Sequence, residues 1–355
     1  MTAFEVMLKD HIECFSQIRG YAVMVQQCNP SSAAYIHLHT DTDIFQRFFV
    51  CFEAQKRGFI EGCRPFISIG GCHLKGPYGG VILSAVALDA NSGLYPLAYC
   101  ICKGETLLSW SWFLRQLCCF LKYLEDRPIC FISDRQKGVI GALKMYWPNA
   151  SWAKDEEALL ETSKTGDKHE FKKCIQDIGS INSQGMAYLA AIEPCHWSRH
   201  AFDKSIKCDH VTNNMTEAFN SMLKYFRAMT YLGLMEYIRR MVMSRFQQRK
   251  DECSRWGNGV PPAVNKKIKN NSVECKILRT LYSGQGKYEM LGVNRAYTVN
   301  LNDKTCECGQ WQVSGVPCCH ALASIRHHFG VSGNQCSLED YIDPFVVQGS
   351  LSTNL

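Results

Sequence analysis

Three cysteines and one histidine toward the C-terminal end of the chain have the spacing of a metal site. They are Cys306, Cys308, Cys318 and His320, in the pattern C-x-C-x9-C-x-H. The pattern indicates one ligand pair on a hairpin turn and the other at the start of a helix expected over 321–328. Thiolate sulfur and imidazole nitrogen are typical ligands of tetrahedral Zn²⁺. Four protein ligands fill that coordination shell, so we predict one structural zinc ion without a catalytic water.

Two alternatives for this cluster stay open at the level of sequence. The cysteines could be unligated core residues in a chain that has 20 of them, and Cys319 could replace a neighbour as ligand. A disulfide is disfavoured in a reducing compartment. We prefer Cys318 and His320 because they fit the C-x-H spacing. No other region of the sequence groups three cysteines with a histidine in this way.

A second candidate site involves carboxylates at the ends of predicted strands. Asp134 directly follows the apolar run 129–133, and the carboxyl ends of central strands are where α/β units bind their ligands. The neighbouring strand end, where a second carboxylate is needed, carries Gly70 and Gly71 instead. Asp134 also fits a second interpretation, as the N-cap of the helix that follows it.

A third group of potential ligands is His196, Trp197 and His200. For these residues, aromatic packing and hydrogen bonding within a loop are the preferred interpretation.

The segment 64–146 must position Asp134. Apolar runs bounded by Gly, Pro and Asn predict strands at 64–69, 81–88, 94–102 and 129–133, and helical periodicity predicts helices at 107–124 and 137–146. Three strands, a helix, a strand and a helix are the beginning of a ribonuclease H-like layout. That layout needs a fifth strand, but the sequence after Ala150 shows none and soon becomes charged and helix-prone. We therefore expect an incomplete core.

Helices are expected on both sides of this α/β unit. Apolar residues at three- and four-residue spacing predict a helix over 1–30, and 45–58 fits a second helix that leads into the first strand. After the core we expect a charged helical stretch, three further helices and a hairpin, at 154–172, 215–226, 233–250, 265–281 and 288–300 respectively.

The chain divides into five parts on this basis. Residues 1–62 are expected to form a helical N-terminal segment, 63–150 the incomplete core, 151–283 a helical and basic region that completes the same domain, 284–330 the zinc module, and 331–355 a C-terminal tail. The expected fold class is therefore α/β, with a partial ribonuclease H-like core, helical additions and a small zinc module.

Positive charge is concentrated in one stretch of the sequence. The net charge of the chain is +6, but residues 221–280 contain 13 Lys or Arg and 4 Asp or Glu, a net of +9. This concentration favours a polyanionic partner such as DNA, with phosphate contacts that position the protein without reading sequence. A solvated helix surface is the alternative.

Cysteine usage and hydropathy bound the environment of the protein. The cysteines are scattered through predicted helices and strands, and the N-terminus does not resemble a signal peptide. No run approaches the roughly 20 apolar residues that a membrane span requires. We expect a soluble, intracellular protein with reduced cysteines and no membrane association.

Several motifs resemble known families. CECGQWQVSGVPCCHALA, which holds the cysteine cluster, resembles the SWIM zinc finger. GCHLKGPYGGVILSAVALDANSGLYPLAYCICKGETLLSWSWFL, with FISDRQKGVIGAL and WPNA, resembles plant Mutator-like element (MULE) transposases. HWSRHAFDKSIKCDHVTNNMTEAFNSML continues the second resemblance, which covers nearly the entire chain in collinear order.

The resemblance implies a ribonuclease H-like core in which three carboxylates hold two divalent metals for DNA strand cleavage and transfer. Asp134 matches the second aspartate, and Glu217 is the candidate for the glutamate. The first aspartate belongs at the position of Gly70, which has no group to coordinate a metal. The nearest acidic residues downstream are Asp89 and Glu105, which fit a hairpin turn and a helix N-terminus.

We therefore expect a nuclear, transposon-derived zinc protein with a silent catalytic core. It would retain DNA binding through 221–280, or protein binding through the zinc module. The rivals are an active transposase, which would need Mg²⁺ or Mn²⁺, and the product of a decayed element without a function. The target DNA and the oligomeric state do not follow from the sequence.

Overall fold

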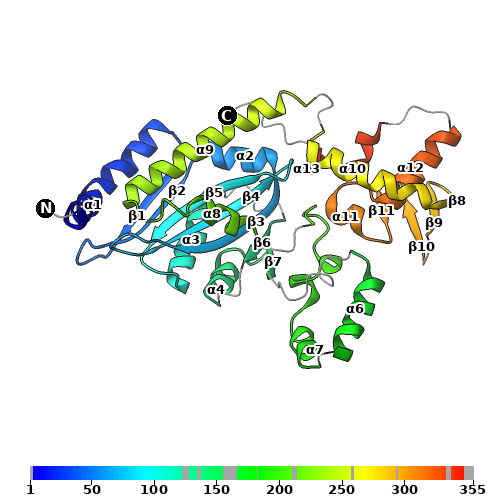
Figure 1. Ribbon diagram of the computed structural model, residues 1–355, viewed down its shortest axis with the longest axis horizontal. Coiled ribbons are helices and arrows are strands. Elements are labelled where there is room, and N and C mark those ends of the chain that lie inside the picture. Colours follow the sequence, from blue (N-terminus) through cyan, green and yellow to red (C-terminus); the bar gives the residue numbers. More distant parts are fainter. Residues whose placement is uncertain are drawn as a thin grey trace.

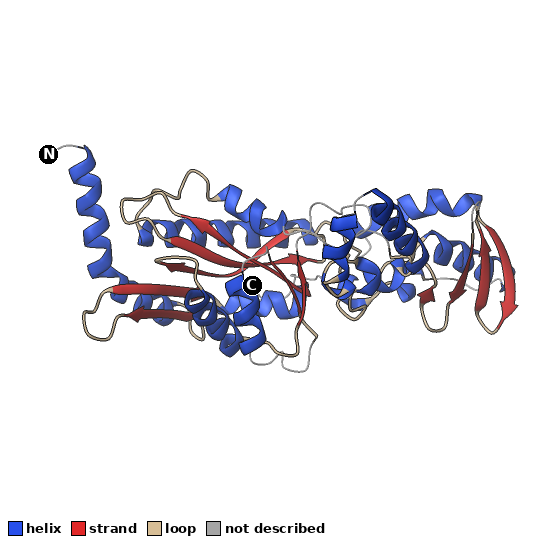
Figure 2. Ribbon diagram, turned by 90° about the horizontal axis from the view of Figure 1, so that it is seen from below, coloured by secondary structure: helices blue, strands red, loops and turns tan. Residues whose placement is uncertain are grey.

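The computed structural model describes residues 3–121, 128–133, 137–154, 166–181, 183–209, 214–256, 260–292, 295–332 and 337–347. Figure 1 shows an elongated molecule with a large mixed sheet at one end and a small antiparallel sheet at the other. Figure 2 shows the two sheets from below, with helices between them. None of the helices described is both long enough and apolar enough to cross a membrane.

The large sheet has seven strands in the order β1-β2-β5-β4-β3-β6-β7. They are Ala33–Leu38 (β1), Phe45–Cys51 (β2), Cys63–His73 (β3), Val81–Asp89 (β4), Leu94–Cys102 (β5), Cys130–Ser133 (β6) and Ser151–Lys154 (β7). β6 runs parallel to both β3 and β7, and the other neighbouring pairs are antiparallel. The four predicted core strands are present. β3 extends beyond its predicted end to His73.

The prediction that no strand follows Ala150 is wrong. Ser151–Lys154 forms β7, which pairs in parallel with β6 from Cys130–Ser151 to Ser133–Lys154. The strand has four residues and a charged sequence follows it, so it carries too little alternation to be recognised. β7 forms its backbone hydrogen bonds with one edge of β6, whose other edge is paired with β3. This tertiary pairing, and not a local sequence pattern, defines the strand.

The N-terminal part also differs from its prediction. The helix over 1–30 is confirmed as α1 (Ala3–Cys28), but the residues predicted as a helix over 45–58 begin with strand β2. Helix α2 (Glu53–Gly62) starts only after it. Phe48 and Phe49 of β2 are fully buried between β1 and β5, and this packing favours aromatic residues in a strand. Residues 33–51 therefore add two strands to the sheet.

Helices cover both faces of the large sheet. α3 (Leu107–Phe120) packs with α4 (Lys137–Tyr146), while α8 (Asn214–Met222) packs on β3, β4 and β5. Gly70 faces Thr216 of α8, and the next residue, Gly71, faces Glu105 at the start of α3. Because successive residues of a strand point to opposite faces, α8 and α3 lie on opposite sides of the sheet.

A smaller helical unit lies between the sheets. It comprises α6 (Lys168–Ile181), α7 (Ser183–Ala190) and the 3-10 turns Pro194–His196 and Arg199–Ala201. Phe171, Leu189 and Trp197 form its core. Of the helix predicted over 154–172, only the part from Lys168 is described as helical, and 155–165 lie outside the described residues.

The C-terminal module has its own apolar core. It consists of α10 (Pro262–Glu274), a 3-10 turn (Cys275–Ile277), β8 (Arg279–Gly284), β9 (Lys287–Leu291), β10 (Ala296–Asn300), β11 (Thr305–Cys306), α11 (Gln310–Ser314) and α12 (Cys319–Ser332), followed by a 3-10 turn (Leu338–Tyr341) and α13 (Pro344–Val347). The hairpin predicted over 288–300 is confirmed by β9 and β10. The helix predicted over 265–281 ends at Glu274, and Arg279 begins β8.

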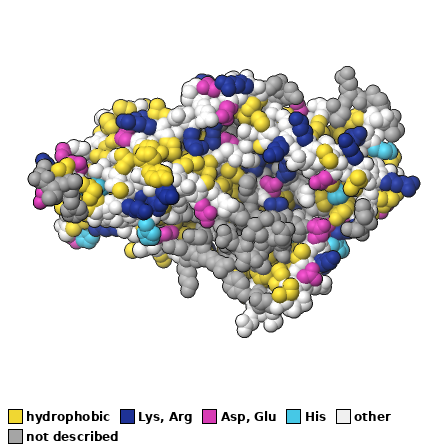
Figure 3. Space-filling model, in the orientation of Figure 1, with side chains coloured by type: hydrophobic (Ala, Val, Ile, Leu, Met, Phe, Trp, Pro, Cys, Tyr) yellow, Lys and Arg dark blue, Asp and Glu magenta, His cyan; other side chains and the backbone are white. Residues whose placement is uncertain are grey.

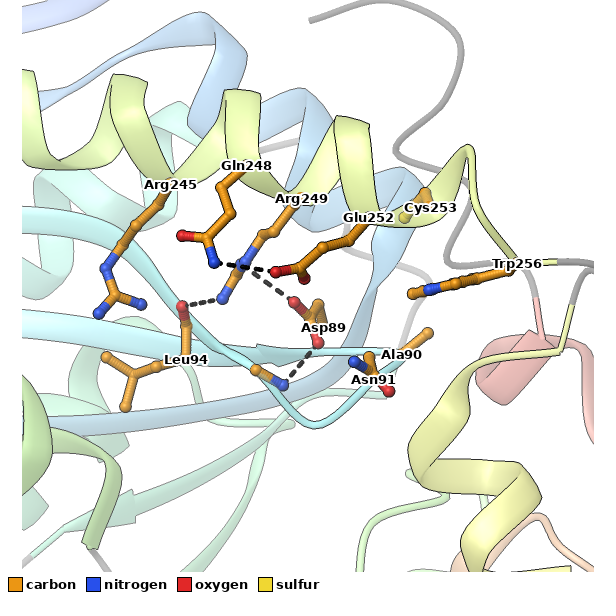
Figure 4. Close-up of a pocket in the computed structure, with 11 residues that line it drawn as sticks. Asp89, Ala90, Asn91, Leu94, Arg245, Gln248, Arg249, Glu252, Cys253 and Trp256 are labelled. Atoms are coloured by element: carbon orange, nitrogen blue, oxygen red, sulfur yellow. Dashed lines mark hydrogen bonds and ion pairs between the residues drawn. The ribbon is translucent and has the colours of Figure 1, made fainter.

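The long basic helix α9 (Tyr231–Cys253) is tied to the sheet by a buried ion pair. Arg249 Nη1 lies 3.1 Å from Asp89 Oδ2 at the end of β4, and Arg249 also donates to the Leu94 carbonyl oxygen (Figure 4). Asp89 accepts a 2.6 Å hydrogen bond from the Gly93 N–H, as expected of a turn residue. Burial raises the pKa of Asp89, and Arg249 opposes that shift.

We predict that Arg249→Ala lowers the free energy of unfolding by about 3 kcal/mol, because it leaves the Asp89 carboxylate buried without its cation. Arg240→Ala on the same helix is the matched control. Arg240 is 75% exposed and pairs with Glu236, so its loss should change stability by less than about 1 kcal/mol. Urea denaturation of both variants measures the difference, and equal losses would contradict an anchoring role for Arg249.

Candidate metal centre, strand-end site and basic surface

The four predicted zinc ligands come from two neighbouring parts of the C-terminal module. Cys306 ends β11, and Cys308 lies in the turn that follows. Cys318 directly precedes α12, and His320 lies in its first turn. Pairing of Cys306 with Val299 of β10 holds the first ligand pair on the small sheet.

The ligand atoms of these residues all lie within 4.8 Å of one another. His320 Nδ1 is 3.7 Å from Cys306 Sγ and 3.9 Å from Cys318 Sγ. A tetrahedral ion with Zn–S bonds of about 2.3 Å and a Zn–N bond of about 2.0 Å puts sulfur and nitrogen about 3.5 Å apart. The cluster therefore fits a structural Zn²⁺ held through Nδ1. Cys319 is not part of this group.

Local hydrogen bonding shapes the loop that carries the first ligand pair. Gly309 has a φ of 72°, and an added Cβ would collide with the Gly166 carbonyl oxygen, so glycine is required there. Gln312 Nε2 donates to the Cys306 carbonyl oxygen at 2.9 Å, and the Cys306 N–H donates to Gln312 Oε1 at 3.2 Å. Gln312 escapes sequence-based prediction because a contact with a ligand's backbone leaves no spacing signal.

The electrostatics of the cluster favour a cation. Cys306, Cys308, Cys318 and His320 are all buried. Hydrogen bonds with Cys306 and Cys318 lower the pKa of Cys308. Burial alone would lower the pKa of His320, but hydrogen bonds with Cys306 and Cys308 raise it. Cysteine binds Zn²⁺ as the thiolate, so zinc binding at this cluster would release protons from it.

The preferred interpretation of His196, Trp197 and His200 is confirmed. The His196 ring stacks on Trp152, with centroids 3.6 Å apart, and its Nδ1 lies 2.7 Å from the Trp152 carbonyl oxygen. Trp197 packs in the core of the helical unit. His200 stacks on Phe171, with centroids 3.9 Å apart. His196 also belongs to a group with Glu193 and Cys195, but that group is largely exposed.

At the strand-end site, Thr216 of α8 occupies the space in which the first carboxylate is expected. Gly70 is buried in β3, and an added Cβ would lie 3.2 Å from both Cβ and Oγ1 of Thr216. Thr216 Oγ1 is 3.1 Å from Ser68 Oγ, so this threonine is itself held against β3. The space next to Gly70 is therefore occupied by α8.

Of the two remaining predicted carboxylates, only Glu217 is among the described residues. Glu217 follows Thr216 on α8 and is exposed. Asp134 lies outside the described residues. The strand before it, β6, ends at Ser133 opposite Ile69, so the chain leaves β6 next to Gly70. Within the described residues, the sheet register places the end of β6 beside Gly70, and α8 brings Thr216 against the same glycine.

Glu105 lies on the opposite side of β3 from Thr216. An added Cβ at Gly71 would lie 2.7 Å from Glu105 Oε2, and the Trp110 indole N–H donates to Glu105 Oε1 at 3.3 Å. Asp89 ends β4, where it contacts Gly93 and Arg249. Gly70 pairs with Ser84, which lies nearer the beginning of that strand. Neither residue occupies the Gly70 position.

A basic surface lies where α9 leads into α10. A cavity of about 480 Å³ is lined by Arg255, Trp256, Val260, Pro262, Asn265, Lys266 and Lys269. Three of these residues are cationic, none is acidic, and Lys266 and Lys269 are exposed on one side of α10. Figure 3 shows further Lys and Arg side chains over α9 and α10, with acidic side chains among them.

We predict that the purified protein contains one zinc ion per chain and that Cys308→Ser loses it, because three ligands hold structural zinc poorly. Cys319→Ser is the control, since Cys319 adjoins the ligands without joining their group. Zinc content by atomic emission gives the stoichiometry. Retention of zinc by Cys308→Ser, or its loss from Cys319→Ser, would show that the ligand set is wrong.

Comparisons with known proteins agree with both parts of this description. The MULE transposase domain matches residues 66–153, which run from β3 through most of β7. The SWIM zinc finger matches residues 297–329, which contain all four cysteine and histidine ligands. No curated protein matched the chain. The two domain matches together indicate a MULE-like, transposase-related protein with a zinc-binding module.

Proposed function

We propose that this is a transposon-derived zinc protein whose transposase core is catalytically silent and which retains DNA binding. The proposal has three parts, concerning the layout of the core, the loss of its metal site and the use of its basic surface. Nuclear localisation follows from the third part, because nuclear DNA is then the partner.

The strand order supports a ribonuclease H-like core. In β5-β4-β3-β6-β7, the first three strands form an antiparallel meander and the last three are parallel, with helices α3 and α4 in the crossovers. This order supports the ribonuclease H-like layout that the sequence suggested, and it includes a fifth strand, β7. A missing fifth strand therefore does not account for a loss of catalysis.

One observation carries the proposal: the position expected to hold the first carboxylate is Gly70, and Thr216 fills the space beside it. A pair of divalent cations needs the negative charge of all its carboxylates. A glycine contributes none, and Thr216 offers only a hydroxyl that is already next to Ser68. Glu105 lies on the other face of β3, where its orientation is fixed by Trp110. Mg²⁺ or Mn²⁺ would be bound only if another group completed the site.

We predict that the wild-type protein does not nick supercoiled plasmid in Mg²⁺ or Mn²⁺, and that Gly70→Asp does not acquire this activity. The introduced side chain must displace Thr216, so Gly70→Asp should lose about 1–3 kcal/mol of stability through overpacking. Gly70→Ala separates the effect of size from that of charge. Nicking by the wild type that disappears in Asp134→Ala would establish an active transposase.

The basic surface supports DNA as the polyanionic partner. Arg255, Lys266 and Lys269 surround the half-buried Trp256, and no acidic side chain lines the same cavity. Cations next to an aromatic ring suit a phosphate backbone with an exposed base or sugar against it. The zinc module's ligand geometry favours neither DNA nor protein, so a protein partner through that module is the second possibility.

We predict that the double variant Lys266→Gln, Lys269→Gln weakens binding to duplex DNA of any sequence. Each lost phosphate contact should also reduce the slope of log affinity against log salt by about 1. The double variant Lys9→Gln, Lys103→Gln, which removes two exposed lysines outside this surface, is the charge-matched control. Fluorescence anisotropy at several salt concentrations measures both quantities, and an unchanged slope in the double variant would remove this surface from DNA binding.

A further inference from the structure

A second cavity lies where the large sheet, the helical unit and the zinc module meet. Its volume is about 320 Å³, and it is lined by Arg64, Ser92, Arg199, Asp209, Ala263, Val264, Lys267, Ser314 and Val316. The lining comes from β3, the β4–β5 turn, the helical unit, α10 and the loop before the second zinc ligand pair. This volume is at the lower end of the range for small-molecule sites.

The charges that line this cavity do not balance. Arg64, Arg199 and Lys267 face one carboxylate, Asp209, whose Oδ2 is 2.5 Å from Lys267 Nζ. Three cations against one anion leave a net charge of +2. Asp89 lies near enough to act on Arg64, but Asp89 is also paired with Arg249. Including that pair gives four cations and two anions, which again is +2.

Two of the guanidinium groups have unused hydrogen-bond capacity. Arg64 is 6% exposed. Among the described residues, it forms one hydrogen bond, in which its Nη2 donates to Ser92 Oγ at 3.3 Å. The Nε atoms of Arg64 and Arg199 are buried and have no hydrogen-bond partner among the described residues. Buried donors of this kind are costly unless a partner satisfies them.

Arg249, close to the same β4–β5 turn, is paired with a carboxylate, although its Nη1 also has no hydrogen-bond partner among the described residues. On the other side of the β4–β5 turn, Arg249 has both a carboxylate and a carbonyl oxygen as partners (Figure 4). Among the described residues, Arg199 donates a hydrogen bond to the backbone oxygen of Asp209 at 2.5 Å. Burial lowers the pKa of Arg199, although Asp209 opposes that shift. A buried guanidinium in this state is stabilised by an added anion.

The N-terminus of helix α10 adds a further preference for negative charge in the cavity. Ala263 and Val264 are in the first turn of the 13-residue helix α10, so the positive end of its dipole lies at the cavity. Arginine forks and a helix N-terminus are the groups that bind phosphate oxygens in proteins.

We propose that this cavity is a binding site for a phosphate group, held by Arg64, Arg199 and Lys267. The bound phosphate joins β3, the helical unit and α10, and so fixes the zinc module relative to the sheet. Its source is either a free phosphate compound or a phosphate of bound DNA. The site is separate from the basic surface around Trp256, because Lys267 and Lys266 point into different cavities.

Adjacent lysines of α10 provide a matched test in the zinc-loaded, full-length protein. Inorganic phosphate is titrated by calorimetry at constant ionic strength in chloride buffer. We expect the wild type to bind one phosphate, Lys267→Gln and Arg199→Gln to bind it at least tenfold more weakly, and Lys266→Gln to bind it within twofold of the wild type. Absence of phosphate binding by the wild type, or equal binding by Lys266→Gln and Lys267→Gln, overturns the proposal.

Competition with DNA identifies the source of the phosphate. A duplex with 5′-phosphates that displaces inorganic phosphate, when the same duplex without them does not, supports the site with a DNA end as ligand. Displacement by both duplexes supports it with an internal DNA phosphate. If neither displaces bound phosphate, the site takes a free phosphate compound. The phosphate titrations contain no DNA, so they test this cavity whether or not the Lys266→Gln, Lys269→Gln variant loses DNA binding.

Discussion

The pairing of β3 on both of its edges is the constraint on which the rest of the structure depends. β3 is antiparallel to β4 along one edge and parallel to β6 along the other, and nearly all of its eleven residues are buried. A shift of one residue would break both ladders and exchange the two faces of the strand. This register directs Gly70 toward α8 and Gly71 toward Glu105, and it sets Arg64 at the start of the strand beside the charged cavity.

Polar contacts around one short turn connect the sheet to the remainder of the molecule. Next to the β4–β5 turn, Asp89 forms an ion pair with Arg249 of α9. Within the turn, Asn91 Oδ1 accepts a 2.9 Å hydrogen bond from the Ala263 N–H, and Ser92 Oγ accepts one from Arg64. The sheet and the zinc module have separate apolar cores, and of these contacts the hydrogen bond between Asn91 and Ala263 reaches from the sheet to α10. Arg64, Arg199 and Lys267 line the cavity beside this turn, so an anion bound there would contact both β3 and α10.

Sequence reasoning recovered the elements whose signals are local. α1 and α4 have long helical periodicity, and β4 and β5 are apolar runs on either side of an Asp- and Gly-containing turn, so their ends were predicted to within a few residues. β2 and β7 were missed because neighbouring strands define them. FQRFFVC also fits a helix, and SWAK is too short to show any period. The end of the helix predicted over 265–281 failed similarly, since β8 exists through its pairing with β9.

The candidate sites divide along the same line. The sequence by itself determined which four residues have the chemistry and spacing of a zinc site, and that the position expected to hold the first carboxylate carries glycine, because ligand chemistry and the absence of a side chain are properties of residue type. Only the tertiary structure decided that Thr216 fills the space at Gly70, that Gln312 braces Cys306, and that Arg64, Arg199 and Lys267 share one cavity. The residues at Gly70 and in the cavity are distant in the sequence, and such contacts arise from how the sheet, the helices and the module pack, which no local pattern records. Gln312 is only six positions from Cys306, but its contact depends on the fold of the loop between them.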